Sequence, residues 1–284
     1  MRMTDQTRKA EQFRALHIAG KPLVLLNIWD AGGTKAVAAG GAKAIATSSW
    51  SVANANGFSD GEQTSLTLAI ENLRRIVGAT DLPVTIDLES GYGDASEAVG
   101  ETIAAAINAG AIGCNLEDSF PVGGKLRETV DQANRIRRAR QSADAANIPF
   151  FINARTDVFF QRPPEQHDKG MLVEVIERAS AYREAGADGL FAPGLADITL
   201  IARLAEVSPL PLNIMVGDAT PPGCALAEHG VARVSFGPHP YVRAMMALEE
   251  AAREASAPSP IPIPTTTNSP AKNGTPNPAI SSKS

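Results

Sequence analysis

Short apolar runs recur along roughly the first 240 residues and alternate with helical patterns. Four runs follow a glycine, which suits the left-handed residue after a helix. Four other runs begin at a proline, which is tolerated at the first residue of a strand but not inside it. Together they predict eight buried strands, at residues 41–46, 110–116, 186–191, 230–236, 22–27, 83–87, 149–153 and 211–216.

Between these runs, apolar residues repeat with the spacing of one helix face, as in residues 66–77 and 98–107. Eight strands that alternate with helices predict a single α/β domain, a (β/α)8 barrel of the TIM type, with an extra helix at its N-terminus. A doubly wound open sheet is the alternative, because the number of strands does not prove closure. In either fold, functional side chains are expected at the carboxyl ends of the strands.

Composition limits the classes of function. The 284 residues carry a net charge of -5 and no run of basic residues, which argues against a nucleic-acid partner. No apolar stretch is long enough to cross a membrane, and the N-terminus lacks the apolar region of a signal peptide. Cys114 and Cys224 form no CxxC pair, so we expect no disulfide and a cytoplasmic location. Residues 1–256 are predicted to be the catalytic domain and residues 257–284, rich in Pro, Ser and Thr, a disordered tail.

Acidic residues gather at the predicted strand ends. Asp87 and Glu89 are two residues apart and are expected to share a face, and Glu117 and Arg155 end later strands. Carboxylates that converge cannot all stay ionised without a compensating cation, and Arg155 supplies only one charge. Oxygen ligands in number favour Mg²⁺, with Mn²⁺ possible. Asp60, on a preceding loop, can join them or can instead cap a helix together with Gln63.

The segment Gly91-Tyr92-Gly93 nearly matches a dinucleotide-binding motif, because it follows a strand and precedes a helix. The third glycine of that motif is missing, and the carboxylates of Asp87 and Glu89 would repel a pyrophosphate. We therefore interpret these glycines as a turn that brings backbone close to the metal site.

These strand ends resemble the isocitrate lyase/phosphoenolpyruvate mutase superfamily over residues 13–254. The motifs that carry the resemblance are Asn27–Asp30, Thr47–Ser49, Asp87–Gly93, Asn115–Asp118 and Asn153–Asp157. The resemblance implies a barrel whose last helix is swapped between subunits, in a homodimer or homotetramer. It also implies Mg²⁺ and a small carboxylate substrate.

The resemblance also implies roles for single residues. Asp87 matches the direct metal ligand, and Asp60, Glu89 and Glu117 match acids that hold the ion mainly through water. Arg155 looks like the arginine that binds the substrate, and we expect it to act in catalysis together with Asp60 and Glu117. The substrate-binding residues that we expect are Ser48, Ser49, Trp50, Gly91, Tyr92 and Asn213.

Departures from the superfamily patterns limit the reaction. The loop 118–126 lacks the Cys and His of the isocitrate lyases and the Asn of the phosphonate mutases, and Pro193 replaces a mutase His. The favoured function is a Mg-dependent lyase or hydrolase that cleaves a carbon–carbon bond in a small 2-oxo or 2-hydroxy dicarboxylate through an enolate. The alternatives are a carbon–phosphorus mutase or hydrolase, such as a phosphoenolpyruvate or carboxyphosphonoenolpyruvate phosphonomutase, and a non-catalytic metabolite-binding barrel.

Overall fold

The computed structural model describes residues 4–256. The chain divides into a unit that ends at Ala244 and a second unit that begins at Met245. Within the second unit, the described residues form the end of helix α10 (His239–Ser256). The predicted tail, residues 257–284, lies outside the described residues.

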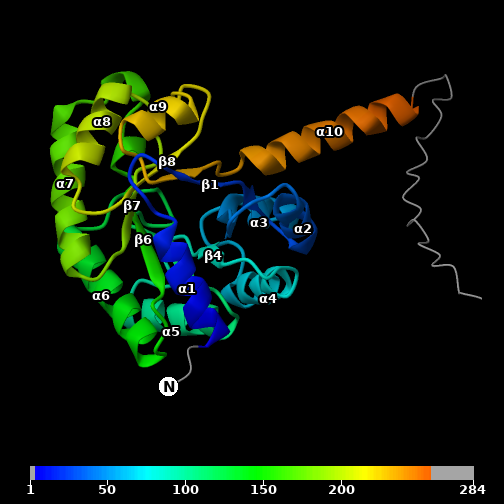
Figure 1. The fold of residues 1–284 in the computed structure, drawn as a ribbon, viewed down its shortest axis with the longest axis horizontal. Helices are drawn as coiled ribbons and strands as arrows, with labels where there is room; N and C mark the ends of the chain where they lie inside the picture. Colours follow the sequence, from blue (N-terminus) through cyan, green and yellow to red (C-terminus); the bar gives the residue numbers. More distant parts are fainter. Residues whose placement is uncertain (1–3, 257–284) are drawn as a thin grey trace, which may run out of the picture. The chain divides into compact units, whose positions relative to one another are not determined.

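Nine parallel strands form a nearly closed barrel in the first unit (Figure 1). The first predicted strand is split at Leu26, so that β1 pairs with β9 while β2 pairs with β3. The sheet therefore comes round on itself, which confirms the barrel and not the open sheet. The strands are β1 (Leu23–Leu25), β2 (Asn27–Ile28), β3 (Ile45–Thr47), β4 (Val84–Asp87), β5 (Gly113–Glu117), β6 (Phe151–Arg155), β7 (Gly189–Phe191), β8 (Leu212–Met215) and β9 (Arg233–Ser235).

Helices lie between the strands and bury the apolar faces that the sequence pattern predicts. In α4, for example, Leu73 and Ile76 are fully buried, and Ser65 caps the helix by accepting a hydrogen bond from the Leu68 amide. The α-helices before α10 are α1 (Asp5–Ala15), α2 (Ala31–Ala39), α3 (Ser49–Ala55), α4 (Leu66–Val77), α5 (Ser96–Asn108), α6 (Thr129–Ala145), α7 (Lys169–Glu184), α8 (Ile198–Val207) and α9 (Gly223–Glu228). Two 3₁₀ helices, η1 (Val158–Phe160) and η2 (Pro164–Gln166), follow β6.

The extra N-terminal helix, α1, packs against the amino ends of the strands. Phe13 is fully buried and meets the Phe151 ring edge-on, with 5.4 Å between ring centroids. The Gln6 side chain donates hydrogen bonds to the carbonyl oxygens of Ile107 and Ala111, just before β5. Because α1 covers this end of the barrel, the opposite, carboxyl end is left for function.

Two further observations bear on the sequence predictions. Cys114 is buried and Cys224 is exposed, and both are free thiols, as expected. None of the helices within residues 4–256 combines the length and the apolar character needed to cross a membrane.

His17, which follows α1, should make stability depend on pH. Its ring stacks on Phe151 at 4.2 Å, and its Nδ1 contacts the Phe13 carbonyl oxygen at 2.9 Å. Burial, together with the nearby charge of Arg233, lowers the pKa of His17 from 6.5 to about 3. The unfolded chain therefore takes up a proton below pH 6.5 that the folded protein resists, and stability should fall by at most about 1.4 kcal/mol per pH unit.

Urea denaturation of the wild type and of His17→Asn between pH 7.5 and about pH 4.5 measures this effect. Asn can still donate to the Phe13 carbonyl oxygen but does not titrate, so the variant should lose part of the acid-induced destabilisation. His229→Asn, on the exposed end of α9, is the matched control. An unchanged pH dependence in His17→Asn would show that His17 does not cause it.

Candidate active site

A cavity of about 180 Å³ opens at the carboxyl ends of the strands. Asp87 and Arg155, which end β4 and β6, are charged residues in its lining. Phe191 and Met215, which end β7 and β8, are apolar residues in its lining. The residues that line it are Asn27, Ser48, Ser49, Trp50, Asp60, Asp87, Asn115, Arg155, Phe160, Phe191, Pro193, Met215, Ser235, Gly237 and Pro238.

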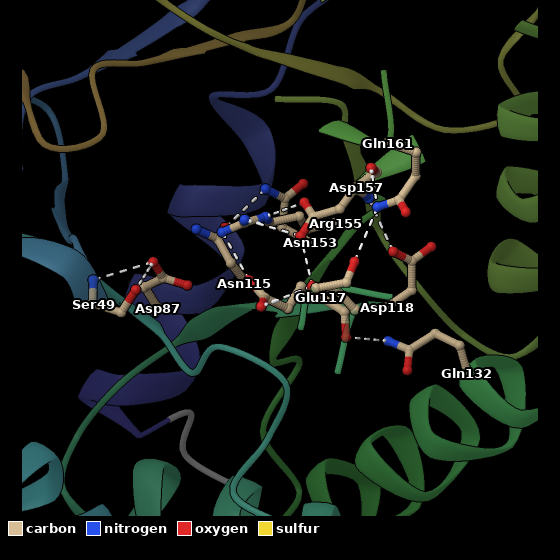
Figure 2. A network of polar contacts seen from close by, with 12 residues as sticks. Ser49, Asp87, Asn115, Glu117, Asp118, Gln132, Asn153, Arg155, Asp157 and Gln161 are labelled. Atoms are coloured by element: carbon tan, nitrogen blue, oxygen red, sulfur yellow. Dashed lines mark hydrogen bonds and ion pairs between the residues drawn. The ribbon is translucent and has the colours of Figure 1, made fainter. Parts of the chain in front are cut away.

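Asp87 presents one carboxylate oxygen without a partner. Its Oδ2 accepts hydrogen bonds from the backbone N–H of Ser49 at 3.2 Å and from the Ser49 hydroxyl at 2.9 Å, as Figure 2 shows. Its backbone N–H donates to the Thr47 hydroxyl, which fixes the end of β4 against β3. Oδ1 is buried and has no hydrogen-bond partner within residues 4–256. A buried carboxylate oxygen of this kind calls for a hydrogen-bond donor or a cation.

Asp60 lines the same cavity, but not as a helix cap. Ser65 caps α4, and the Gln63 side chain donates to the Gly61 carbonyl oxygen, so the expected capping box does not form. Burial and the neighbouring charge of Asp87 raise the pKa of Asp60. Asp60 and Asp87 therefore form an acidic pair at the mouth of the barrel.

The side chain of Glu89 does not follow the alternation of a strand, which predicted that it shares a face with Asp87. The strand β4 ends at Asp87, and Glu89 has a φ of +50°, in the left-handed region. Its Oε2 accepts hydrogen bonds from the backbone N–H groups of Gly61 and Glu62 at 2.9 and 2.5 Å. Burial and the nearby charge of Asp60 raise the pKa of Glu89 to about 7. Glu89 therefore anchors the loop that carries Asp60.

Arg155 is clamped between two carboxylates. Its Nε and Nη2 donate to Asp157 at 2.6 and 3.1 Å, and its Nη1 lies 2.8 Å from Oε2 of Glu117 (Figure 2). Burial raises the pKa of Glu117, whereas Arg155 lowers it. Burial opposes the charge on Arg155, but Glu117 and Asp157 outweigh that effect and raise its pKa. The guanidinium is thus a fixed, permanently charged wall of the cavity.

Asp118 holds the backbone of Asp157, one of the two partners of Arg155, and the sequence analysis did not predict this role. It is fully buried, and its Oδ1 accepts a hydrogen bond from the backbone N–H of Asp157 at 2.9 Å. Its Oδ2 accepts from the Tyr182 hydroxyl at 2.8 Å and from Arg178 at 3.2 Å. Two of these partners come from α7, about 60 residues later, so no local pattern around Asp118 could have revealed its role.

Comparison with known proteins identifies the family. Residues 13–256 match the sequence profile of the phosphoenolpyruvate phosphomutase family. The chain belongs to this family. It is 35% identical over 247 residues to the uncharacterised protein Rv1998c of Mycobacterium tuberculosis H37Rv, covering 86% of this chain and 88% of that protein. It is 31% identical to 2-methylisocitrate lyase of Escherichia coli K12, covering 74% and 71%.

Solved structures agree with this family. A Burkholderia cenocepacia J2315 protein, proposed to be a phosphonomutase, has a TM-score of 0.86 at 56% identity, with 88% of this chain and 99% of that chain covered. A phosphonopyruvate hydrolase in complex with oxalate and Mg²⁺ has a TM-score of 0.75 at 22% identity, covering 89% and 92%, and shares the fold. The resemblance seen in the sequence is confirmed, and the protein is an enzyme related to the lyases and mutases of this superfamily.

The expected substrate-binding residues divide into two groups within the family fold. Ser48, Ser49 and Trp50 line the cavity, where Ser48 also caps α3. Gly91, Tyr92 and Asn213 do not line it. A Cβ at Gly91 would lie 3.0 Å from the Leu116 side chain, and Tyr92 lies with Glu89 around a smaller cavity of about 10 Å³. Asn213 is fully buried and accepts a hydrogen bond from the Ser235 hydroxyl.

The structure adds cavity residues that were not predicted as substrate ligands. Asn27 and Asn115 are among the polar residues at the ends of the predicted apolar strands, so their placement was visible in the sequence although their roles were not. Oδ1 of Asn27 accepts hydrogen bonds from the backbone N–H groups of Phe236 and Gly237 and so fixes the loop after β9. Phe160 and Met215 carried no polar signal, and only the folded chain places them at the cavity.

The acidic residues fit a divalent cation only in part. Within residues 4–256, no three His, Cys, Asp or Glu side chains are grouped so that they could hold one ion. Glu89 contacts the Gly61 loop and Glu117 contacts Arg155, so the expectation that these two acids join Asp87 around a metal ion stays a prediction. The free Oδ1 of Asp87, with Asp60 beside it, does fit a hard cation that has one direct protein ligand and several waters.

Proposed function

We propose that this family member cleaves or forms a bond to carbon 3 of a small 2-oxo or 2-hydroxy acid through an enolate, with Mg²⁺ bound at Asp87. The observation that carries this proposal is the free Oδ1 of Asp87 in the same cavity as the clamped guanidinium of Arg155. Mn²⁺ would fit the same oxygen ligands. A cavity of about 180 Å³ suits a small acid.

Each side chain then has a task. Asp87 would hold the cation directly, and Asp60, Glu89 and Glu117 would act on it through water. When bound, the cation supplies Lewis-acid stabilisation of the substrate oxygens. The N–H groups of Arg155 that Glu117 and Asp157 leave free can donate to the oxygen on which negative charge develops. Because these partners hold the guanidinium in place, it need not reorganise during the reaction.

Carbon–carbon cleavage of a small dicarboxylate is the favoured reaction. The relation to 2-methylisocitrate lyase at 31% identity supports it. The loop after β5 forms a short hairpin, in which Ser119 bridges to Leu126 and the Phe120 N–H donates to the Lys125 carbonyl oxygen. This hairpin carries neither Cys nor His, so proton transfer would depend on Asp60, Glu117 or water. The free thiols of Cys114 and Cys224 suit action in the cytoplasm.

Carbon–phosphorus chemistry on a phosphonate is the second candidate. The 56% identical relative proposed to be a phosphonomutase supports it. A hydrolase would release inorganic phosphate and pyruvate from phosphonopyruvate, whereas a mutase would convert phosphonopyruvate into phosphoenolpyruvate without releasing phosphate. Membership of this family and the relation to 2-methylisocitrate lyase argue against the third alternative, a barrel that binds a metabolite without catalysis.

A substrate screen with the Asp87→Ala variant tests the metal assignment. Oxo and hydroxy diacids and phosphonopyruvate are incubated with excess Mg²⁺, and the release of pyruvate, glyoxylate, oxalate or phosphate is measured. Loss of the direct ligand should reduce turnover at least about a thousandfold, since the cation contributes several kcal/mol. Asp81→Ala, at an exposed residue before β4, is the control and should keep full activity. Full turnover by Asp87→Ala would contradict the assignment.

We also propose that the enzyme assembles as a homodimer or homotetramer through α10. Barrel strands normally have their outer faces covered by helices, but Val24 and Leu26 are 51% and 42% exposed. They line a mostly apolar groove of about 810 Å³, with Lys21 and Lys43 also lining it.

Helix α10 has no buried residue and exposes Val242, Met245, Met246 and Leu248. Its acidic residues Glu249 and Glu250 complement the lysines, so α10 of a second copy is a fitting cover for this groove.

The mass in solution checks this assembly. Sedimentation analysis should give a dimer or tetramer for the wild type and a monomer for the double variant Met246→Glu/Leu248→Glu, because burying two charges without partners is costly. Ala247→Glu, on the side of the helix away from Val242 and Met245, should leave the mass unchanged. A monomeric wild type, or a double variant that stays assembled, would contradict the proposal.

A further inference from the structure

Arg233 on β9 is a buried cation without a carboxylate partner. It is 1% exposed, and no acidic side chain within residues 4–256 forms an ion pair with it. Its Nε donates to the Ser235 hydroxyl and its Nη2 to Oδ1 of Asn115, both at 3.3 Å, while Nη1 has no partner. The Phe13 ring of α1 lies 6.0 Å from its guanidinium carbon. A buried charge so poorly compensated costs stability, and such a residue is a candidate for a functional role.

Asn115 connects this cation to the cavity. Its Cα pairs with that of Asp87 across β4 and β5, and its side chain lines the cavity. Its Oδ1 accepts from Arg233 and also from Nδ2 of Asn153, at 2.9 Å. Its Nδ2 has no hydrogen-bond partner within residues 4–256 and is not among the fully buried atoms. The amide nitrogen is therefore free to donate to a ligand in the cavity.

The two asparagines alone cannot fix which way this amide points. Asn153 has a buried Oδ1 without a partner, so both amides could turn over together and keep one hydrogen bond between them. A guanidinium has donors only and no acceptor, so the atom of Asn115 that faces Arg233 must be the oxygen. Arg233 thus removes the alternative in which Asn115 presents an oxygen to the cavity beside Asp87.

We propose that Arg233 is a positioning residue, which holds the Asn115 amide so that its Nδ2 donates to an oxygen of the acid bound beside Asp87. This assignment of the ligand rests on the proposed function. Without Arg233, the amide can present its oxygen instead, next to the Asp87 carboxylate. A donor to the bound acid is then replaced by an acceptor, which a carboxylate ligand does not tolerate.

Binding of oxalate in excess Mg²⁺, measured by calorimetry, tests the coupling between the two residues. Arg233→Met and Asn115→Ala should each weaken oxalate binding about tenfold, the effect expected for one hydrogen bond. The double variant should bind no more weakly than Asn115→Ala alone, because Arg233 acts through Asn115. Arg233→Lys, which keeps a donor-only group, should recover part of the affinity. Losses that add in the double variant, or full affinity in Arg233→Met, would overturn the proposal.

The orientation can be followed without metal or ligand. In ¹⁵N-labelled protein, the Asn115 side-chain NH₂ signals are those missing in Asn115→Ala. The wild type and Arg233→Lys should give one pair of signals, and Arg233→Met should shift or double that pair. An unchanged pair in Arg233→Met would overturn the proposal, even if the wild type fails to bind oxalate and the proposed function falls. If Arg233→Met does not fold, Arg233→Gln takes its place, because Gln offers both a donor and an acceptor and should give the same results.

Discussion

The burial of several carboxylates beside one guanidinium is the constraint on which this site depends. Asp60, Glu89 and Glu117 all have raised pKa values because burial disfavours their charged forms. Arg155 forms ion pairs with Glu117 and Asp157, whereas within residues 4–256 neither Asp87 nor Asp60 forms one. The other polar contacts at the carboxyl end of the barrel satisfy only some of these carboxylate oxygens. Backbone N–H groups hold Glu89, the Ser49 side chain and amide hold one oxygen of Asp87, and the other oxygen stays open.

The sequence predicted the barrel and most of its mouth because both follow from regular periods. The strands could be predicted from apolar runs that begin at Gly or Pro. Asp87, Glu117 and Arg155 could be predicted as site residues because they are polar and end such runs. Alternation along a strand failed at Glu89, because the chain turns into the left-handed region just after β4. A two-residue period holds only while the backbone stays extended. The same turn carries Gly91 and Tyr92 behind the cavity and not into it.

Interactions between distant segments were beyond the reach of sequence patterns. The support of Asp157 by Asp118 needs Arg178 and Tyr182 from α7. The polar interior below the cavity needs side chains of β5, β6 and β9 to meet, as Asn115, Asn153 and Arg233 do. That interior extends from the Phe13 ring of α1 to the Asn115 amide at the cavity. The helix that closes one end of the barrel is thereby joined through packed side chains to the site at the other end.

The most direct test of the central claim is a crystal structure of the enzyme grown with Mn²⁺ and oxalate, with anomalous scattering used to locate the metal. We expect one Mn²⁺ peak at coordination distance, about 2.1 to 2.3 Å, from Oδ1 of Asp87. We also expect oxalate to bind that ion and to accept a hydrogen bond from Arg155. An anomalous peak at another place, or oxalate bound in the cavity without a metal at Asp87, would contradict the account.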